Sequence, residues 1–173
     1  MNAPTVRPFK DTDTPGAARA LISVHATDGY PVEGVDEPEA WIQAPDVISA
    51  WIAETNAAIV GHVAIMRPNG EEAVSLWQRQ SGADESTIAV LARLFVIREA
   101  RKKATGERLM RAATEHARQK RLRLVLDVMT KDTAAIHLYE RLGWKRIGQA
   151  IHRYGNSQHT DALCYVSPEN GPA

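Results

Sequence analysis

One stretch of the chain, residues 90–120, constrains the fold more than any other. The apolar run Val90–Ile97 predicts a strand, and the charged pair Arg98 and Glu99 marks its end. The basic segment Arg101–Gly106 follows, and apolar positions at helical spacing then predict a helix. The first N–H groups of a helix have no partner within it, and the peptide dipoles add about half a positive charge there. Strand, basic loop and helix N-terminus together therefore predict an anion site.

The bulk composition bounds the class of protein. With 173 residues the chain has the length of one domain, which we expect to span 1–173 with loose ends at about 1–4 and 168–173. The net charge of zero and the 44% apolar content argue against a disordered segment or a purely electrostatic nucleic-acid binder. The single cysteine, Cys164, excludes an internal disulfide, and no apolar run reaches about 18 residues. We therefore expect a soluble, cytoplasmic protein without a membrane segment.

Strands and helices alternate in the second half of the chain, whereas the first half contains a hairpin. Gly61 interrupts the second strand of that hairpin, which predicts a bulge or a close backbone approach. This mixture predicts an α/β domain with a mixed, largely antiparallel central sheet. The expected strands are Thr5–Phe9, Val47–Glu54, Ala57–Met66, Thr87–Ile97, Leu122–Met129, Trp144–Ile151 and Ala162–Val166. The expected helices are 11–26, Pro38–Gln43, Ala73–Gln80, one that follows the basic segment, and one that Asp132 or Thr133 caps.

Two motifs carry a resemblance to a known family. The segment Arg101–Gly106 has the spacing Arg-x-x-Ala-x-Gly, which is close to the Arg/Gln-x-x-Gly-x-Gly/Ala signature of the GNAT acetyltransferases. Further along, Asp132–Trp144 is similar to the family pattern Asn-x-x-Ala-x-x-x-Tyr-x-x-x-Gly-Phe. The chain resembles this family over roughly residues 90–145. The resemblance implies the acyl-CoA N-acyltransferase fold, in which helices flank a sheet that splays between its fourth and fifth strands.

The resemblance also implies acetyl-CoA as the co-substrate and no metal. The pyrophosphate of coenzyme A needs converging N–H donors, which the turn over residues 102–107 can supply. The pantetheine arm is an amide chain, and it can pair with the backbone at the end of the preceding strand like an added strand. The cofactor-binding residues expected on this basis are Leu94, Phe95, Val96, Arg101, Lys102, Lys103, Ala104, Thr105, Gly106, Glu107, Asp132 and Ala135.

Acyl transfer from a thioester needs an attacking amine, a stabilised oxyanion and a leaving thiolate. A phenol with a pKa of about 10 can protonate a thiolate whose conjugate acid titrates near about 8.5, so we assign Tyr139 as the general acid. By resemblance, the N–H of Val96 is the oxyanion partner. Asp127 can accept the proton of the amine through water, the alternative being a structural aspartate bonded to nearby backbone. Glu54 and His62 are further candidates for that base.

Two positions depart from the family pattern. Ala104 stands where the first glycine is usual, and a positive φ there would cost on the order of 1 kcal/mol with alanine. The hydroxyl of Thr105 is expected to compensate in part by reaching the phosphate. Asp132 stands where asparagine is usual, which removes a side-chain donor, although an aspartate still caps a helix.

The sequence leaves the acceptor open, as an amine-bearing small molecule or peptide. The acidic loop Glu33–Glu39 would attract a cationic amine, and an ordinary exposed loop explains it equally well. The basic run Arg118–Arg123 lacks interleaved aromatic residues, so we expect no nucleic-acid partner. A non-catalytic acyl-CoA sensor is the alternative to an enzyme, and by resemblance to the family a homodimer is possible.

Overall fold

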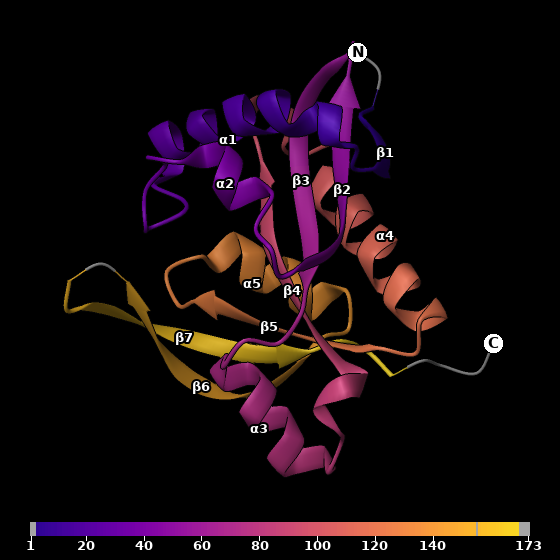
Figure 1. The fold of residues 1–173 in the computed structure, drawn as a ribbon, viewed down its shortest axis with the longest axis vertical. Coiled ribbons are helices and arrows are strands. Elements are labelled where there is room, and N and C mark those ends of the chain that lie inside the picture. The colour runs from indigo at the N-terminus through magenta and orange to yellow at the C-terminus, as the bar shows by residue number, and fades with distance from the viewer. Residues whose placement is uncertain (1–2, 155, 170–173) are drawn as a thin grey trace. The chain divides into compact units, whose positions relative to one another are not determined.

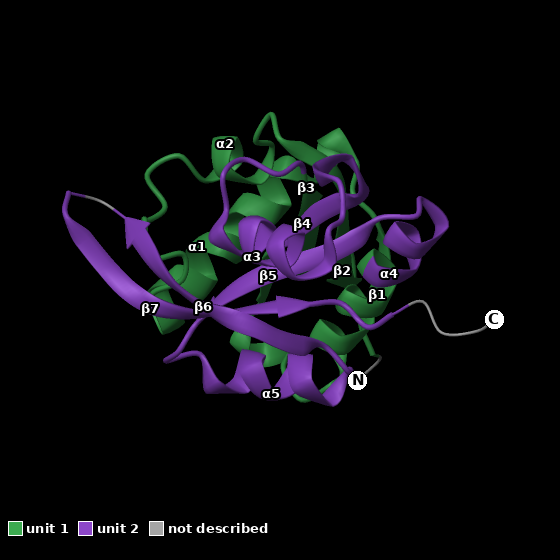
Figure 2. Cartoon of the chain, turned by 90° about the horizontal axis from the view of Figure 1, so that it is seen from below, with its two compact units in different colours: residues 1–66, 92–113 green, residues 67–91, 114–173 purple. Residues whose placement is uncertain are grey.

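The computed structural model describes residues 3–154 and 156–169, and these form two compact units (Figure 2). Unit 1 comprises residues 1–66 and 92–113, and unit 2 comprises residues 67–91 and 114–173. The expected loose ends fall largely on residues 1–2 and 170–173, which lie outside the described residues. The strands are β1 (Thr5–Pro8), β2 (Val47–Thr55), β3 (Ala58–Met66), β4 (Ile88–Val96), β5 (Arg123–Met129), β6 (Lys145–Tyr154) and β7 (Gln158–Val166). The α-helices are α1 (Thr14–Asp28), α2 (Pro38–Ile42), α3 (Glu72–Ser81), α4 (Thr105–Gln119) and α5 (Thr133–Arg141). Short 3₁₀ helices span Asp11–Asp13, Glu85–Thr87 and Arg98–Ala100.

The sheet order is β1-β2-β3-β4-β5-β7-β6, and this confirms the expected mixed, largely antiparallel architecture (Figure 1). The β1/β2, β2/β3, β5/β7 and β6/β7 ladders are antiparallel, whereas β4 and β5 run parallel. The parallel ladder covers only the start of β4, from Ile88 opposite Arg123 to Val90 opposite Val125. Arg93 then takes a left-handed φ of 59°, which interrupts regular strand geometry in the middle of β4.

In unit 1, helices α1 and α2 pack on β3 and on the end of β4 (Figure 1). The apolar face of α1 supplies Ala17, Leu21 and Val24, which are almost fully buried beside Phe95. Pro15 stands in the first turn of α1, where its missing N–H costs nothing. The β2–β3 hairpin turns through Asn56 and Ala57, at φ values of 52° and 64°, one residue later than the sequence predicts.

Gly61 combines a bulge with a close approach, as its position in the strand predicted. The β2/β3 register shifts between Ala53 and Glu54, opposite this part of β3. A Cβ at Gly61 would lie 3.1 Å from Leu109 Cδ1 and 3.2 Å from the carbonyl oxygen of Phe95. Because a carbonyl of the backbone cannot move aside as a side-chain end can, this close approach requires glycine.

In unit 2, α3 and α5 lie on opposite faces of the β5-β7-β6 strands (Figure 2). A Cβ at Gly148 would lie 3.0 Å from Leu76 of α3, whereas Tyr139 of α5 packs against Tyr165. Gly148 pairs with Cys164, and Tyr165 is the next residue of β7, so these contacts confirm that neighbouring residues of β7 face different helices.

The β6–β7 ribbon extends further than the sequence predicts. Its ladder continues to Tyr154 opposite Gln158, whereas β5 ends at Met129 opposite Ala162. The residues in the extension are mostly polar, so their alternation carries no hydrophobic signal and the strands were expected to be shorter. Gly155, between the two strands, lies outside the described residues. None of the helices in the described part of the chain is both long enough and apolar enough to cross a membrane.

Candidate active site

The basic turn before α4 has left-handed backbone at two positions. Lys102 has a φ of 64° and Ala104 a φ of 57°, so alanine does occupy a conformation that glycine adopts more easily. The helix begins directly after it, because the N–H of Arg108 donates to the carbonyl of Ala104 at 3.0 Å. The first N–H groups of α4 therefore emerge from a tight, basic turn, which is the arrangement that suits a phosphate group.

Two side chains of the turn have other partners than the sequence suggested. Thr105 is 2% exposed, and its hydroxyl donates to the carbonyl of Ala100 at 3.0 Å, so the proton expected to reach a phosphate is already in use. The Nε of Arg101 donates to the carbonyl of Val96 at 3.1 Å, and its guanidinium also pairs with Asp28. Both side chains thus stabilise the turn, which leaves its backbone N–H groups as the donors best suited to a phosphate.

The end of β4 presents Leu94, Phe95 and Val96, the expected pantetheine partners. Phe95 is 4% exposed and stacks on His62 of β3, with ring centroids 5.2 Å apart. Leu94 and Val96 are partly exposed. Their neighbour Arg93 places its guanidinium 4.5 Å from the ring of Trp41, and it donates to the carbonyl of Trp41.

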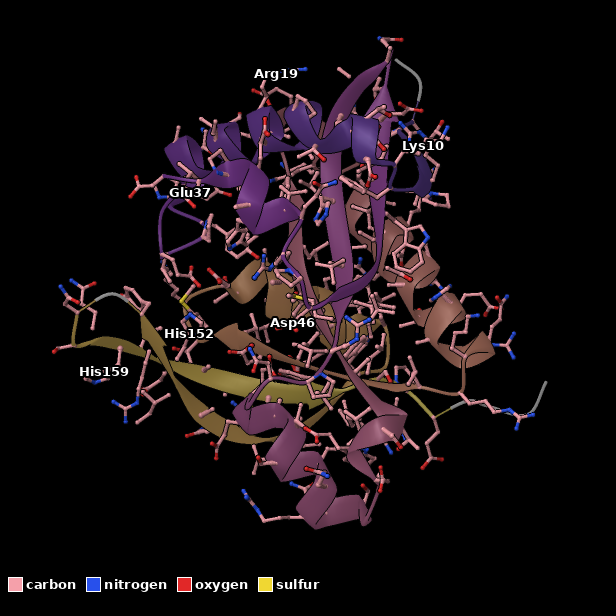
Figure 3. All side chains as sticks on the ribbon, viewed as in Figure 1. Lys10, Arg19, Glu37, Asp46, His152 and His159 are labelled. Atoms are coloured by element: carbon pink, nitrogen blue, oxygen red, sulfur yellow. The ribbon has the colours of Figure 1, made fainter. Side chains whose placement is uncertain are left out.

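Arg93 is a charged group that the sequence reasoning missed. Burial lowers its pKa, while the negative charges of Glu33 and Asp46 act in the opposite direction. Asp46 is labelled in Figure 3. Glu33 belongs to the acidic loop that was expected to attract a cationic amine. Part of the charge of that loop is therefore balanced by an arginine of the same unit.

Neither of the hairpin candidates for a base is suited to that role. His62 is fully buried, and its Nδ1 lies 2.8 Å from the carbonyl oxygen of Arg93, which favours the proton on Nδ1. Burial lowers the pKa of His62 to about 4, so the ring stays neutral near pH 7. Glu54 accepts from Arg7 Nε at 3.0 Å, and Arg7 also binds Asp13 at 2.8 Å, on the wall of a cleft of about 400 Å³. Both are structural groups.

In unit 2, Tyr139 lies on α5 in an aromatic cluster. It is 7% exposed, and its ring centroid lies 6.1 Å from that of Trp144 and 6.2 Å from that of Tyr165. Burial raises the pKa of its phenol, and the carboxylates of Asp132 and Asp127 raise it further. The phenol therefore keeps its proton at neutral pH, as a proton donor must.

Asp132 precedes α5 as expected, with a backbone at φ −86° and ψ 66°, but its side chain makes no capping hydrogen bond. Asp132 therefore holds the expected N-cap position, where its carbonyl accepts from the N–H of Ile136 at 3.1 Å, but without a side-chain cap, and its charge raises the pKa of Tyr139. Ala135 lies in the first turn of α5 and is partly exposed.

Asp127 lies on β5 with its side chain 39% exposed. Its Oδ2 is 3.4 Å from Nδ1 of His152, a residue of β6 that the sequence reasoning did not select. No motif surrounds His152, and the pairing of β5, β7 and β6 brings the two residues together. Local sequence patterns contain no signal for such a contact.

The basic run at the end of α4 is largely occupied by contacts within unit 2. Arg118 binds Glu115 through two nitrogens, at 2.7 and 2.9 Å. Arg123 donates to the carbonyl of Ser167 at 2.6 and 2.9 Å and lies 5.0 Å from the centre of the Trp77 ring. Among the described residues, no three His, Cys, Asp or Glu side chains form a group that could hold a metal ion.

A match to a family model covers most of the chain. Residues 17–144 match the model of the acetyltransferase (GNAT) family. The chain belongs to the GNAT family. This places it among the N-acetyltransferases and agrees with both motifs, at the turn before α4 and along α5.

Three solved structures share the fold over nearly all of the chain. An N-acetyltransferase from Staphylococcus aureus Mu50 is 16% identical, with 96% of this chain and 99% of that chain covered and a TM-score of 0.72. Arabidopsis thaliana NAA60 in complex with acetyl-CoA is 20% identical, with 98% and 100% covered and a TM-score of 0.72. The putative acetyltransferase yncA from Salmonella typhimurium, solved with its cofactor acetyl-CoA, is 14% identical, with 99% and 97% covered and a TM-score of 0.72. No curated protein matches the sequence closely enough to count as a relative.

Proposed function

We propose that this GNAT chain transfers the acetyl group of acetyl-CoA to a primary amine by direct attack of the amine on the thioester. The observation that carries the proposal is the state of Tyr139, a buried phenol whose pKa is raised by burial and by two carboxylates. A group that remains protonated at neutral pH can supply the proton that a departing thiolate needs.

Binding of acetyl-CoA is supported by the turn before α4 and by the end of β4. The N–H groups of Thr105, Gly106 and Glu107 begin α4 and lack partners within the helix. A pyrophosphate would receive these donors together with the positive end of the helix dipole. The backbone of Leu94–Val96 would pair with the amides of pantetheine, and the N–H of Val96 would stabilise the oxyanion.

Direct attack is also supported by the state of the single cysteine. Cys164 is fully buried, and burial together with the charges of Asp127 and Glu72 raises the pKa of its thiol to about 12. Its nucleophilic thiolate form is therefore scarce at neutral pH, and Cys164 is a poor carrier for an acyl-enzyme intermediate. The acetyl group would then pass from sulfur to nitrogen in one transfer.

The test is release of free coenzyme A thiol from acetyl-CoA in the presence of a panel of amines. Tyr139→Phe removes only the hydroxyl, and we expect kcat to fall by about 10²-fold, the usual contribution of a general acid. Tyr165→Phe is the matched control, since Tyr165 is a buried tyrosine of the same cluster, 2% exposed. It is expected to keep most of the activity.

A Tyr139→Phe variant with wild-type turnover would remove Tyr139 from the reaction. Tight binding of acetyl-CoA in calorimetry, with no thiol release for any amine, would instead favour a non-catalytic sensor. The acceptor, the homodimer and the lack of a nucleic-acid partner stay predictions.

A further inference from the structure

Arg93 on β4 is a partly buried cation without an anionic partner. Among the residues that the structure describes, no carboxylate forms an ion pair with it, whereas Arg7 of the same unit binds Asp13 and Glu54. The side chain of Arg93 donates one hydrogen bond, from Nη1 to the carbonyl of Trp41. A guanidinium has five N–H donors, so most of those of Arg93 have no acceptor in the described part of the chain.

The guanidinium nitrogens of Arg93 that make no hydrogen bond reach the surface. Over the described residues, the one buried nitrogen or oxygen atom of a side chain that lacks a hydrogen-bond partner is Nε2 of His62. Arg93 is partly exposed, so the donors that it does not use within the chain are open to solvent. A ligand can therefore approach them.

Aromatic rings hold this guanidinium beside the end of β4. Cζ of Arg93 lies 4.5 Å from the centroid of the Trp41 ring, which is a cation–π contact. The Trp41 ring lies 6.2 Å from that of Phe95, whose backbone belongs to the segment expected to pair with pantetheine. The carbonyl oxygen of Arg93 lies 2.8 Å from Nδ1 of the buried His62, so the main chain is held as well. A group held in this way loses little conformational entropy when a ligand binds.

We propose that Arg93 binds a carboxylate of the acceptor, so that the acceptor is a zwitterion with its amine beside a carboxylate, as in a free amino acid. The inference rests on the acetyl transfer proposed above and narrows its primary amine to an amino carboxylate. A planar guanidinium and a carboxylate can form two parallel hydrogen bonds, which fix the orientation of the ligand as well as its position.

The charges around Arg93 suit a zwitterion better than a simple cation or a simple anion. Burial lowers the pKa of Arg93 and the charges of Glu33 and Asp46 raise it, so both carboxylates act on this site. They would repel a ligand that carried only a carboxylate and attract one that carried an ammonium group. Arg93 would repel a cation that lacked a carboxylate. An amino acid meets both signs of charge at once.

The place of Arg93 on β4 fits an acceptor of this size. Arg93 precedes Val96, the residue whose N–H is the expected oxyanion partner, by three positions. A strand rises by about 3.3 Å per residue, so the two residues lie at most about 10 Å apart along β4. The amine and the carboxylate of an amino acid are attached to one carbon atom. A carboxylate bound to the guanidinium would therefore leave the amine close to a thioester held at the end of β4.

The transfer balances with this acceptor. The nitrogen forms the N–C bond and the C–S bond of the thioester breaks. The ammonium group loses two protons in all, of which one goes to solvent and the other balances the proton that coenzyme A takes up as a thiol. The product is an N-acetyl amino acid, which keeps its carboxylate but has lost the positive charge. The attraction of Glu33 and Asp46 is then gone, which favours release of the product.

Arg123 of unit 2 offers a matched control. Its Cζ lies 5.0 Å from the centre of the Trp77 ring, and it donates to the carbonyl of Ser167. Burial lowers its pKa, as it does for Arg93. Arg123 stands at the start of β5, away from the residues assigned to the cofactor. Replacing either arginine removes a guanidinium from the face of a tryptophan, and only one of the two lies beside the end of β4.

The experiment measures kcat/KM for sets of three acceptors with the same side chain: a free amino acid, its amide, and the amine without the carboxyl group. In wild type we expect the acid to exceed the amide by about 10- to 100-fold, the contribution of a charge-assisted contact with two hydrogen bonds. The amine of the amide is less basic than that of the acid, so more of it is neutral at a given pH. Basicity alone would therefore give the opposite order.

Arg93→Gln keeps N–H donors but removes the charge, and we expect it to lose the preference for the acid. Arg93→Lys keeps the charge without the planar fork, so its preference should lie between those of wild type and Arg93→Gln. Arg123→Gln should keep the preference of wild type. Urea unfolding checks that each variant is folded, and the comparison of acid with amide in wild type needs no variant.

Two results would overturn the role of Arg93. One is a wild type that acetylates the amide or the simple amine as well as the acid, and the other is a folded Arg93→Gln variant that keeps the preference for the acid. Calorimetry with the same acceptors in the presence of coenzyme A separates this failure from failure of the proposed acetyl transfer. Tighter binding of the acid that Arg93→Gln loses, without thiol release for any acceptor, would remove the transfer and support the carboxylate site. Equal binding of acid and amide without thiol release would remove both.

Discussion

Each compact unit contains a histidine whose Nδ1 faces an oxygen atom, but the two histidines differ in burial and in the charge of that oxygen. In unit 1, His62 is fully buried between aromatic rings, its Nδ1 faces a carbonyl, and burial lowers its pKa to about 4. In unit 2, His152 is partly exposed and its Nδ1 faces a carboxylate at 3.4 Å. A carbonyl inside an apolar core holds a neutral ring in place, whereas a carboxylate near solvent can stabilise a charged one. The surroundings of His62, and not its residue type, therefore keep its ring neutral.

The same contrast extends to the rest of each unit. The groups of unit 1 assigned to the cofactor are mostly backbone amides, held by a turn with left-handed residues and by a close approach at Gly61. The group of unit 2 assigned to the reaction is the phenol of Tyr139. Changes in unit 1 should therefore alter stability and the binding of cofactor and acceptor, and removal of that phenol should alter turnover.

The largest expected effect on stability is the pH dependence that His62 produces. The folded state lowers the pKa of His62 from 6.5 to about 4, so between these values the unfolded chain binds more protons than the folded one. The stabilising contribution of the neutral ring is complete above pH 6.5 and is lost as the pH falls toward 4. We expect the free energy of unfolding to drop by about 3 kcal/mol over that range from this group alone. Urea unfolding at a series of pH values measures it.

His62→Asn is the variant for that comparison, because it keeps an N–H donor for the carbonyl of Arg93 and has no titrating ring. Its free energy of unfolding should change less between pH 7 and pH 4 than that of wild type. If the free energy of unfolding fell equally with pH in the two proteins, protonation of the His62 ring would not destabilise the folded state. The contrast between the two units would then disappear.

A second prediction concerns the packing at Gly61. Gly61→Ala places a Cβ 3.2 Å from the carbonyl oxygen of Phe95, a backbone atom, and we expect a loss of about 2 kcal/mol in the free energy of unfolding. Gly16→Ala makes the same change on α1, where the atoms near the new Cβ are side-chain atoms, Ile59 Cδ1 at 3.0 Å and Arg19 Nη2 at 3.7 Å. It should be neutral or stabilising, because alanine favours a helix over glycine by about 1 kcal/mol. Equal losses in the two variants would contradict the special role of Gly61.

Much of the fold could be predicted from the sequence, because its signals are local. The sequence located both strands of the β2–β3 hairpin on either side of Thr55 and Asn56, and the glycine in its second strand indicated the bulge at Gly61. The position of Ala104 in the phosphate motif raised the question of a positive φ, and the structure has one. Each of these inferences concerns residues that are neighbours in the chain.

The parts that could not be predicted depend on pairing between distant residues. Asp127 and His152 meet because β7 pairs with β5 on one side and with β6 on the other. The polar extension of β6 and β7 has no apolar alternation, so the full length of these two strands could not be predicted from the sequence. Arg93 was missed because no sequence pattern predicts a left-handed arginine in mid-strand. The hydroxyl of Thr105 was assigned to a phosphate because its nearer partner, the carbonyl of Ala100, becomes visible only in the folded turn.

The smallest expected effect on the free energy of unfolding comes from glycine variants at three residues with left-handed backbone. One of them, Ala104, lies in the turn before α4. Ala104 has a φ of 57°, and glycine adopts such a backbone without the clash of a Cβ, so Ala104→Gly should raise the free energy of unfolding by about 1 kcal/mol. Ala57 in the β2–β3 turn and Ser157 in unit 2 have φ values of 64° and 67°, and the free energy of unfolding of their glycine variants should rise by a similar amount.

Calorimetry with acetyl-CoA then distinguishes the three variants by their affinity for the cofactor. Only Ala104→Gly should bind the cofactor more tightly, because only that change lets the backbone approach a phosphate more closely. If all three variants bound acetyl-CoA with equal affinity, the turn before α4 would be a structural turn and not the cofactor site.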